Sequence, residues 1–250
     1  MSGHSKWSSI KHKKGVADAR RGKLFSKLSR AIIVAARDGG GDPAANLALQ
    51  NAIEKARSYS MPKDNIERAI ARGTGADTDE AAFEQVVYEG YGPNGVAILV
   101  EALTDNRNRT AADVRAAFAK HDGNLGGSGA VAWLFERRGV ILVDADRFDE
   151  DDVTLAAAEG GADDVELDGS SFSVTSSAES LSAVRQALED AGLEVDSAEL
   201  TMVPKTTVEL DDESAARKTL RLIDALEESD DVQEVYSNFD IPEQVMEAVV

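Results

Sequence analysis

Apolar positions in the first third of the chain follow the period of an α-helix. From about residue 17 to residue 37, apolar side chains fall on one arc of a helix at about 100° per residue, and cations fall on the opposite arc. The glycines at 39–41 predict the end of this helix. Asp42 and Pro43 predict the N-cap and first turn of a second helix, which runs to about Ser58. A third helix opens at Pro62 and stops near Gly73, so we expect a helical bundle.

The remainder of the chain alternates between strand and helix patterns. Strands are predicted at 83–89 and 96–103 around a glycine-rich turn, followed by a helix at 109–121 and a strand near 131–136. Residues 140–202 have the order β-α-β-β-α-β of the ferredoxin-like motif, starting with a strand at 140–143. A strand, a helix and a strand between about 206 and 237 complete a second α+β sandwich with the elements at 83–121.

These elements predict an α+β multidomain protein: an N-terminal helical bundle followed by two ferredoxin-like α+β domains, one inserted in the other. The predicted domains are a basic helical domain with an N-terminal arm (1–76), a discontinuous α+β domain (77–137 plus 204–250) and an inserted ferredoxin-like α+β domain (138–203). The first boundary follows Gly73-Thr74-Gly75, where an acidic stretch begins.

Charge is divided unequally along the chain. The formal net charge is -19, yet residues 1–75 hold 15 Lys and Arg against 6 Asp and Glu, a net of +9, and the remainder has a net of -28. Such asymmetry indicates a basic contact surface carried on an acidic body. The alternative is that the basic domain docks onto its own acidic body.

The arm and the first helix supply the candidate nucleic-acid contacts. Lysines and arginines engage phosphates, and Trp7 could stack on an exposed base or instead anchor the arm in a core. The candidate nucleic-acid-binding residues are His4, Lys6, Trp7, Lys11, His12, Lys13, Lys14, Arg20, Arg21, Lys23, Lys27, Arg30 and Arg37.

A second candidate site is a polar loop between a predicted strand and a predicted helix. Asp105, Asn106, Arg107, Asn108 and Arg109 form a run with more hydrogen-bonding side chains than a turn needs. This favours contact with a polar partner, such as a nucleic-acid backbone. The alternative is a helix cap, with Asn108 or the following threonine as N-cap and the arginines paired with local acids.

The composition argues against catalysis and against bound cofactors. The chain has no cysteine, and its three histidines have no metal-ligand spacing. The glycine-rich segments fit neither a P-loop nor a dinucleotide fingerprint. The acidic run at 144–151 has Phe148 where a calcium loop needs a ligand. We expect no enzyme activity, metal or cofactor. With no long apolar segment and no secretory signal at the N-terminus, we expect a cytoplasmic protein without a membrane partner.

Four stretches make the chain resemble a known family. They are Gly3-His4-Ser5-Lys6-Trp7 with Ile10 to Lys14, Ala36 to Pro43, Met61 to Ile70, and Tyr88 to Gly95 leading to Leu103 to Thr110. In these the chain resembles the YebC/PmpR family of transcriptional regulators, which includes a mitochondrial translational activator of cytochrome oxidase. The resemblance implies three domains, the third inserted in the second. It also implies sequence-selective DNA binding by some members and ribosome-associated relief of stalling on proline runs by others.

Two positions depart from the pattern of that family. Ala102 stands where a cysteine is expected, and Gly127-Ser128 stands where Thr-Asp is common. The first departure removes any reason to propose thiol chemistry, and the second weakens a role for those side chains.

Charge and resemblance together predict a nucleic-acid-binding regulator of gene expression. The first hypothesis is a DNA-binding transcriptional regulator. The second is a ribosome-associated translation factor that contacts ribosomal or transfer RNA, and the third is an adaptor whose basic domain binds an acidic protein. The sequence contains no recognisable helix-turn-helix, which favours contact with the nucleic-acid backbone over strict readout of bases.

Overall fold

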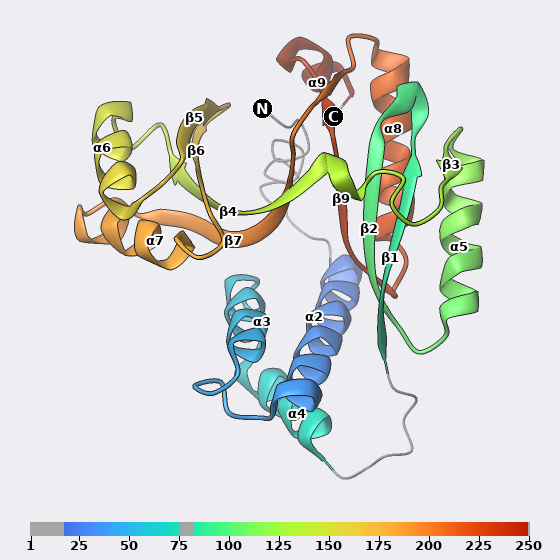
Figure 1. The fold of residues 1–250 in the computed structure, drawn as a ribbon, viewed down its shortest axis with the longest axis horizontal. Helices are drawn as coiled ribbons and strands as arrows, with labels where there is room; N and C mark the ends of the chain where they lie inside the picture. The colour runs from blue at the N-terminus through green and yellow to red at the C-terminus, as the bar shows by residue number, and fades with distance from the viewer. Residues whose placement is uncertain (1–17, 76–82, 250) are drawn as a thin grey trace.

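The computed structural model describes residues 18–75 and 83–249, which form a helical bundle, two four-stranded antiparallel sheets and one short parallel pair of strands (Figure 1). The bundle consists of α2 (Asp18–Gly39), α3 (Leu47–Ser58) and α4 (Lys63–Thr74). Its core is built where the apolar faces of the three helices meet, around Ile32, Leu49 and Ile66. Burial of these faces stabilises the bundle, since short helices are marginal on their own in water.

The second helix of the bundle begins later than its sequence predicts. Asp42 accepts the backbone N–H two residues on and so closes a turn instead of capping the helix. The N-cap is Asn46, whose side chain accepts from the N–H of Leu49 at 3.1 Å. Its amide also donates to the carbonyls of Ala35 and Gly40, at 2.7 and 2.8 Å. Asn46 therefore fixes the start of α3 against the end of α2.

The first sheet has the strand order β3-β1-β2-β9, and helices α5 and α8 supply much of the core on one of its faces. β1 and β2 form a hairpin that pairs Glu84 with Thr104 and Tyr91 with Ala97. Gly90 lies so close to Phe118 of α5 that an added Cβ would come within 2.7 Å of its ring. The elements of this part are β1 (Glu84–Tyr91), η1 (Pro93–Gly95), β2 (Ala97–Thr104), α5 (Arg107–Lys120), β3 (Asn124–Leu125), η2 (Ala132–Leu134), β8 (Val208–Glu209), α8 (Glu213–Glu227), β9 (Val232–Ser237), β10 (Phe239–Asp240) and α9 (Glu243–Val249).

The second sheet has the strand order β5-β6-β4-β7, and its elements follow the ferredoxin-like order β4-α6-β5-β6-α7-β7. Ile141 and Val174 from the sheet pack with Val184 and Leu188 from the helix α7. These elements are β4 (Phe135–Asp144), α6 (Glu150–Gly160), β5 (Asp164–Asp168), β6 (Ser171–Ser176), α7 (Leu181–Asp190) and β7 (Val195–Pro204).

One long strand replaces two strands that the sequence predicts separately. The segments near 131–136 and at 140–143 contribute to a single β4, which pairs with β7 from Phe135 opposite Pro204 to Val143 opposite Val195. The polar residues Arg137 and Arg138 interrupt the apolar pattern, but their backbone continues the pairing. The chain therefore leaves the first sheet and returns to it through two neighbouring strands.

The predicted α+β fold class, with a helical bundle before two α+β units, is confirmed by this arrangement. The boundaries of the three domains stay a prediction. Over the described ranges, no helix combines the length and apolar character that a membrane crossing requires.

Candidate nucleic-acid interface and the domain junction

The predicted nucleic-acid contacts fall into two groups. One group lies outside the described side chains: the arm residues His4, Lys6, Trp7, Lys11, His12, Lys13 and Lys14, together with Arg20 and Arg21 at the beginning of α2. The other group, Lys23, Lys27, Arg30 and Arg37, lies further along α2 and has described contacts. The arm therefore stays a prediction, while the contacts of α2 can be traced.

Three cations of α2 contact the end of α8 and the residues that follow it. Lys23 and Lys27 donate to main-chain carbonyls of its last residues, at 3.3 and 2.6 Å. Arg30 donates to the carbonyl of Asp230 at 2.5 Å and to the carboxylate of Asp231 at 3.0 Å. The C-terminus of a helix carries unsatisfied carbonyls and a partial negative charge, which cations from α2 stabilise. Residues that sequence assigns to nucleic acid therefore hold the bundle against the acidic body.

Two further contacts connect the bundle to the first sheet. Lys55 of α3 forms an ion pair with Glu234 of β9. Although burial opposes its charged form, the carboxylates of Glu234 and Glu199 raise the pKa of Lys55 above its ordinary value. Arg37, near the end of α2, donates to the carbonyl of Phe83 at 3.2 Å. The bundle is thus attached to the body at several separate points.

This arrangement agrees with the alternative reading of the charge division, in which the basic domain docks onto the acidic body. Contact of Lys23, Lys27 and Arg30 with nucleic acid stays a prediction, and it would compete with these interactions. Between α2, α5 and α8 the junction leaves a cleft of about 590 Å³. Arg30 lies in it, with its guanidinium carbon 5.3 Å from the centre of the Phe83 ring.

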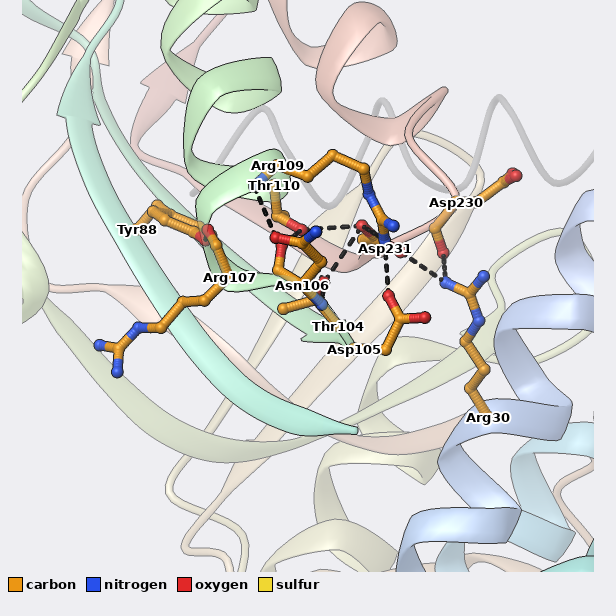
Figure 2. Close-up of polar contacts among 10 residues, drawn as sticks. All are labelled: Arg30, Tyr88, Thr104, Asp105, Asn106, Arg107, Arg109, Thr110, Asp230 and Asp231. Atoms are coloured by element: carbon orange, nitrogen blue, oxygen red, sulfur yellow. Dashed lines mark hydrogen bonds and ion pairs between the residues drawn. The ribbon is translucent and has the colours of Figure 1, made fainter. Parts of the chain in front are cut away.

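The polar loop surrounds the carboxylate of Asp231, which is 5 % exposed (Figure 2). One carboxylate oxygen accepts from Arg109 and Thr110, both at 2.7 Å, and from Thr104 at 3.3 Å. The other oxygen accepts from Arg30 of α2. Although burial favours the neutral acid, hydrogen bonds from Arg109 and Thr110 hold the pKa of Asp231 below its ordinary value. Asp231 therefore joins α2, the polar loop and the start of β9 through one charge.

Most of the polar loop is occupied by contacts within the chain. Asn106, not Asn108 or Thr110, is the N-cap of α5, because its side chain accepts from the N–H of Arg109 at 3.1 Å. Arg109 also pairs with Asp105 at 2.8 Å. Helix α5 accordingly begins two residues earlier than the sequence predicts.

Arg107 and Asn108 differ from their neighbours. Both are exposed, and Figure 2 shows the Arg107 side chain pointing away from the cluster around Asp231. The main-chain carbonyl of Arg107 accepts from the hydroxyl of Tyr88 at 3.3 Å. Contact between the loop and a partner stays a prediction. Arg107 and Asn108 are exposed, so a partner could reach their side chains.

A buried glutamate, which the sequence does not single out, orders the glycine-rich loop. Glu89 of β1 is 6 % exposed and accepts the backbone N–H groups of Gly129, Val131 and Ala132 at 2.7, 2.8 and 2.7 Å. Although burial opposes ionisation, these hydrogen bonds lower the pKa of Glu89. The loop leads to Trp133, which is 65 % exposed. A glutamate at an inner position of an apolar strand is the signal that could have identified this contact.

The described side chains offer no assembled metal site. In residues 18–75 and 83–249, no three His, Asp or Glu side chains lie together in a way that would hold a metal ion. Asp231 and Glu89 are instead neutralised or hydrogen-bonded by the protein itself, so their described role is to position the segments around them.

Comparison with known proteins gives matches along almost the entire chain. Residues 5–76 match the family model described as "TACO1/YebC protein N-terminal domain", and residues 83–239 match "TACO1/YebC second and third domain". A relative from Rubrobacter xylanophilus named "Probable transcriptional regulatory protein" is 62% identical over 249 residues, which is 100% of this chain and 99% of the relative. A relative of the same name from Persephonella marina is 55% identical over 250 residues, with both chains covered completely.

A solved structure has the same fold. It is the crystal structure of a conserved hypothetical protein from Aquifex aeolicus, with a TM-score of 0.80 and 50% sequence identity. The match covers 90% of this chain and 93% of that protein.

Proposed function

The chain belongs to the TACO1/YebC family, and we propose that it is a DNA-binding transcriptional regulator that acts without catalysis. The printed names of its relatives support a regulatory role. The observation that carries DNA binding is the division of charge, with a net of +9 in residues 1–75 on a chain of net -19. A local positive excess attracts phosphates even where the overall charge is negative, because contacts are made within about a Debye length of the surface.

A role without catalysis is part of the proposal, and the contacts of two buried carboxylates support it. The carboxylates with the lowest exposure, Glu89 and Asp231, are occupied by backbone N–H groups or by cations and hydroxyls. These hydrogen bonds hold both carboxylates in the fold, which supports a positioning role for them. The proposal therefore assigns the acidic body to positioning and to protein contacts.

The experiment that tests this function is crosslinking in cells, followed by sequencing of the DNA and the RNA that are bound. A transcriptional regulator gives reproducible peaks at promoters that disappear when residues 1–15 are deleted. Enrichment of ribosomal or transfer RNA without promoter peaks would contradict the proposal. Deletion of the arm removes four lysines. The matched control changes four exposed cations of the body to glutamine, namely Arg147, Arg185, Arg217 and Lys218.

The second candidate is a translation factor associated with the ribosome, and one observation favours it. Helix α2 is rich in cations, but Lys23, Lys27 and Arg30 face the body. A helix held in this way is not free to enter a major groove and read bases. Recognition by shape and backbone contacts, which is typical of structured RNA, needs no such helix. The RNA fraction of the same crosslinking experiment tests this candidate.

A further inference from the structure

Two aromatic side chains lie exposed beside the glycine-rich loop of the body. Trp133 of η2 is 65% exposed, and Tyr91 at the end of β1 is 37% exposed. The indole Nε1 of Trp133 and the hydroxyl of Tyr91 both donate to the carbonyl of Ala130, at 3.2 and 3.0 Å. Because both donors contact one oxygen, they lie within about 6 Å of each other. We call these two side chains the aromatic pair.

The exposure of Trp133 is imposed by its neighbours. Val131 and Phe135, two residues to either side, are 0% and 5% exposed and belong to one buried apolar cluster. Hydrogen bonds from three backbone N–H groups to Glu89 also hold the loop just before Trp133. The ring is therefore held outward on an ordered segment, so a partner that covers it loses little conformational entropy.

The loop beside the aromatic pair has little side-chain cover. Gly127 and Gly129 belong to it, and a Cβ added at either position would meet nothing within 4 Å. Gly129 has a φ of +85°, a conformation that favours glycine. A ligand on the rings can therefore also approach the backbone of this loop, whose carbonyl oxygens are hydrogen-bond acceptors.

A negative charge lies close to the aromatic pair. The Glu89 carboxylate accepts the backbone N–H groups on both sides of Ala130, and within the described ranges no cation forms an ion pair with it. The carboxylate is within roughly 10 Å of the rings, about one Debye length. The surrounding body is also acidic, because residues 76–250 have a net charge of -28. This field favours a cation at the aromatic pair and disfavours phosphates.

The aromatic pair is separate from the junction with the bundle. The carbonyl of Phe83, just before β1, accepts from Arg37 of the bundle. Tyr91 lies eight residues further along the chain, which is about 26 Å in an extended strand. Figure 1 shows β1 running away from the bundle in this direction. A partner on the aromatic pair would therefore not displace the contacts between the bundle and the body.

We propose that the aromatic pair is a docking site for a basic segment of a partner protein, in which an arginine side chain stacks on Trp133. A guanidinium is attracted to the face of an indole ring and stacks on it as a planar group. Its five N–H donors suit the carbonyl oxygens of the neighbouring loop. Tryptophan and tyrosine are also enriched among the residues that dominate binding at protein interfaces. The inference goes beyond the proposed function and does not depend on DNA binding.

The test uses oligoarginine and oligolysine peptides of equal length as probes, in calorimetry of the full chain at about 0.15 M salt. Trp133→Ala should weaken oligoarginine binding about fivefold, as expected for an exposed cation–π contact. It should weaken oligolysine binding less, because an ammonium group does not stack. Trp133→Phe should restore part of the loss. In a Trp7→Phe chain Trp133 is the sole tryptophan, and its fluorescence should change saturably with oligoarginine.

Leu155→Ala is the matched control, because it truncates another apolar side chain of the acidic body that is 65% exposed. It should leave the affinity for oligoarginine unchanged, and thermal unfolding checks that each variant is folded. Equal affinities of the wild type and Trp133→Ala, or equal losses in Trp133→Ala and Leu155→Ala, would overturn the docking site. Equal losses for the two peptides would overturn the stacking of arginine.

Two further outcomes would assign the aromatic pair to a different occupant and so overturn the proposal. The first is that Trp133→Ala weakens binding of single-stranded oligothymidine while oligoarginine binding is unchanged, which indicates contact with unpaired bases. The second is self-association of the wild type in sedimentation that Trp133→Ala abolishes, which indicates a second copy of this chain.

Discussion

The buried carboxylate of Asp231 allows a sharp test of how the bundle is attached to the body. The change is Asp231→Asn, which keeps the size of the side chain and removes its charge. Arg109 lies at one oxygen of this carboxylate and Arg30 lies at the other. Either orientation of the asparagine therefore turns its NH₂ group toward one guanidinium, and the hydrogen bond at that position is lost.

The magnitude follows from the exposure of the partners. Removing one member of a fully buried ion pair costs about 3–5 kcal/mol. Here the Asp231 side chain is 7% exposed, but those of Arg30 and Arg109 are 24% and 48% exposed, so water screens both arginines. We expect Asp231→Asn to lower the free energy of unfolding by about 2 kcal/mol, close to the loss of one hydrogen bond to a charged group.

The assay is urea unfolding at pH 7 and at pH 3, with Asp230→Asn as the control. The control removes the same charge one residue earlier, from an exposed side chain, and should change stability by under about 0.5 kcal/mol. Because the pKa of Asp231 is lowered by folding, its contribution is complete above the unfolded value of about 3.9 and is lost as pH falls through the native value. The difference between wild type and Asp231→Asn should therefore shrink at pH 3. Equal effects of the two variants at pH 7 would refute this reasoning.

Three other predictions follow from the contacts described above. Glu89→Gln should lower the free energy of unfolding, measured in urea, by about 2 kcal/mol, because an amide cannot accept all three N–H groups of the loop. The exposed control Glu84→Gln should change the free energy of unfolding little. Equal losses of stability in the two variants would contradict the role of Glu89. Arg109→Ala should lower the urea midpoint of unfolding, because it removes the hydrogen bond from Arg109 to Asp231. Arg107→Ala should leave that midpoint unchanged but weaken DNA binding if the loop contacts a partner. Deleting residues 1–15 should weaken DNA binding strongly in polarisation assays while thermal unfolding of the body is nearly unchanged; loss of the entire fold would show that the arm is structural.

The sequence predicts those parts of the fold that depend on near neighbours along the chain. In α2, the buried residues Leu28, Ile32 and Ala36 recur with the helical period, so the helix can be recognised without knowing its partner. The hairpin of β1 and β2 is recognisable for the same reason, since its turn and both strands are contiguous. The fold class therefore follows from local patterns and their order.

The contacts that define the junction depend on residues far apart in the sequence. Asp231 is separated from Arg109 and Thr110 by more than 120 residues, and nothing local distinguishes it from Asp230 beside it. Asn46 caps α3 because its amide also reaches the end of α2, an advantage that Asp42 lacks and that no sequence pattern reveals. The division of charge along the chain likewise left two alternatives open, contact with nucleic acid and docking onto the acidic body. Charge alone does not specify which way the cations of α2 face.

The salt dependence of DNA binding tests the central claim most directly, which is that the basic N-terminal third carries the contact with nucleic acid. Lys23, Lys27 and Arg30 are engaged by the body, so the contacts of the first 37 residues should come from the cations before them. These cations are Lys6, Lys11, Lys13, Lys14, Arg20 and Arg21. If about six cations meet phosphates, the log of the affinity for duplex DNA falls with the log of salt concentration at a slope near -5. A slope near zero would contradict the account.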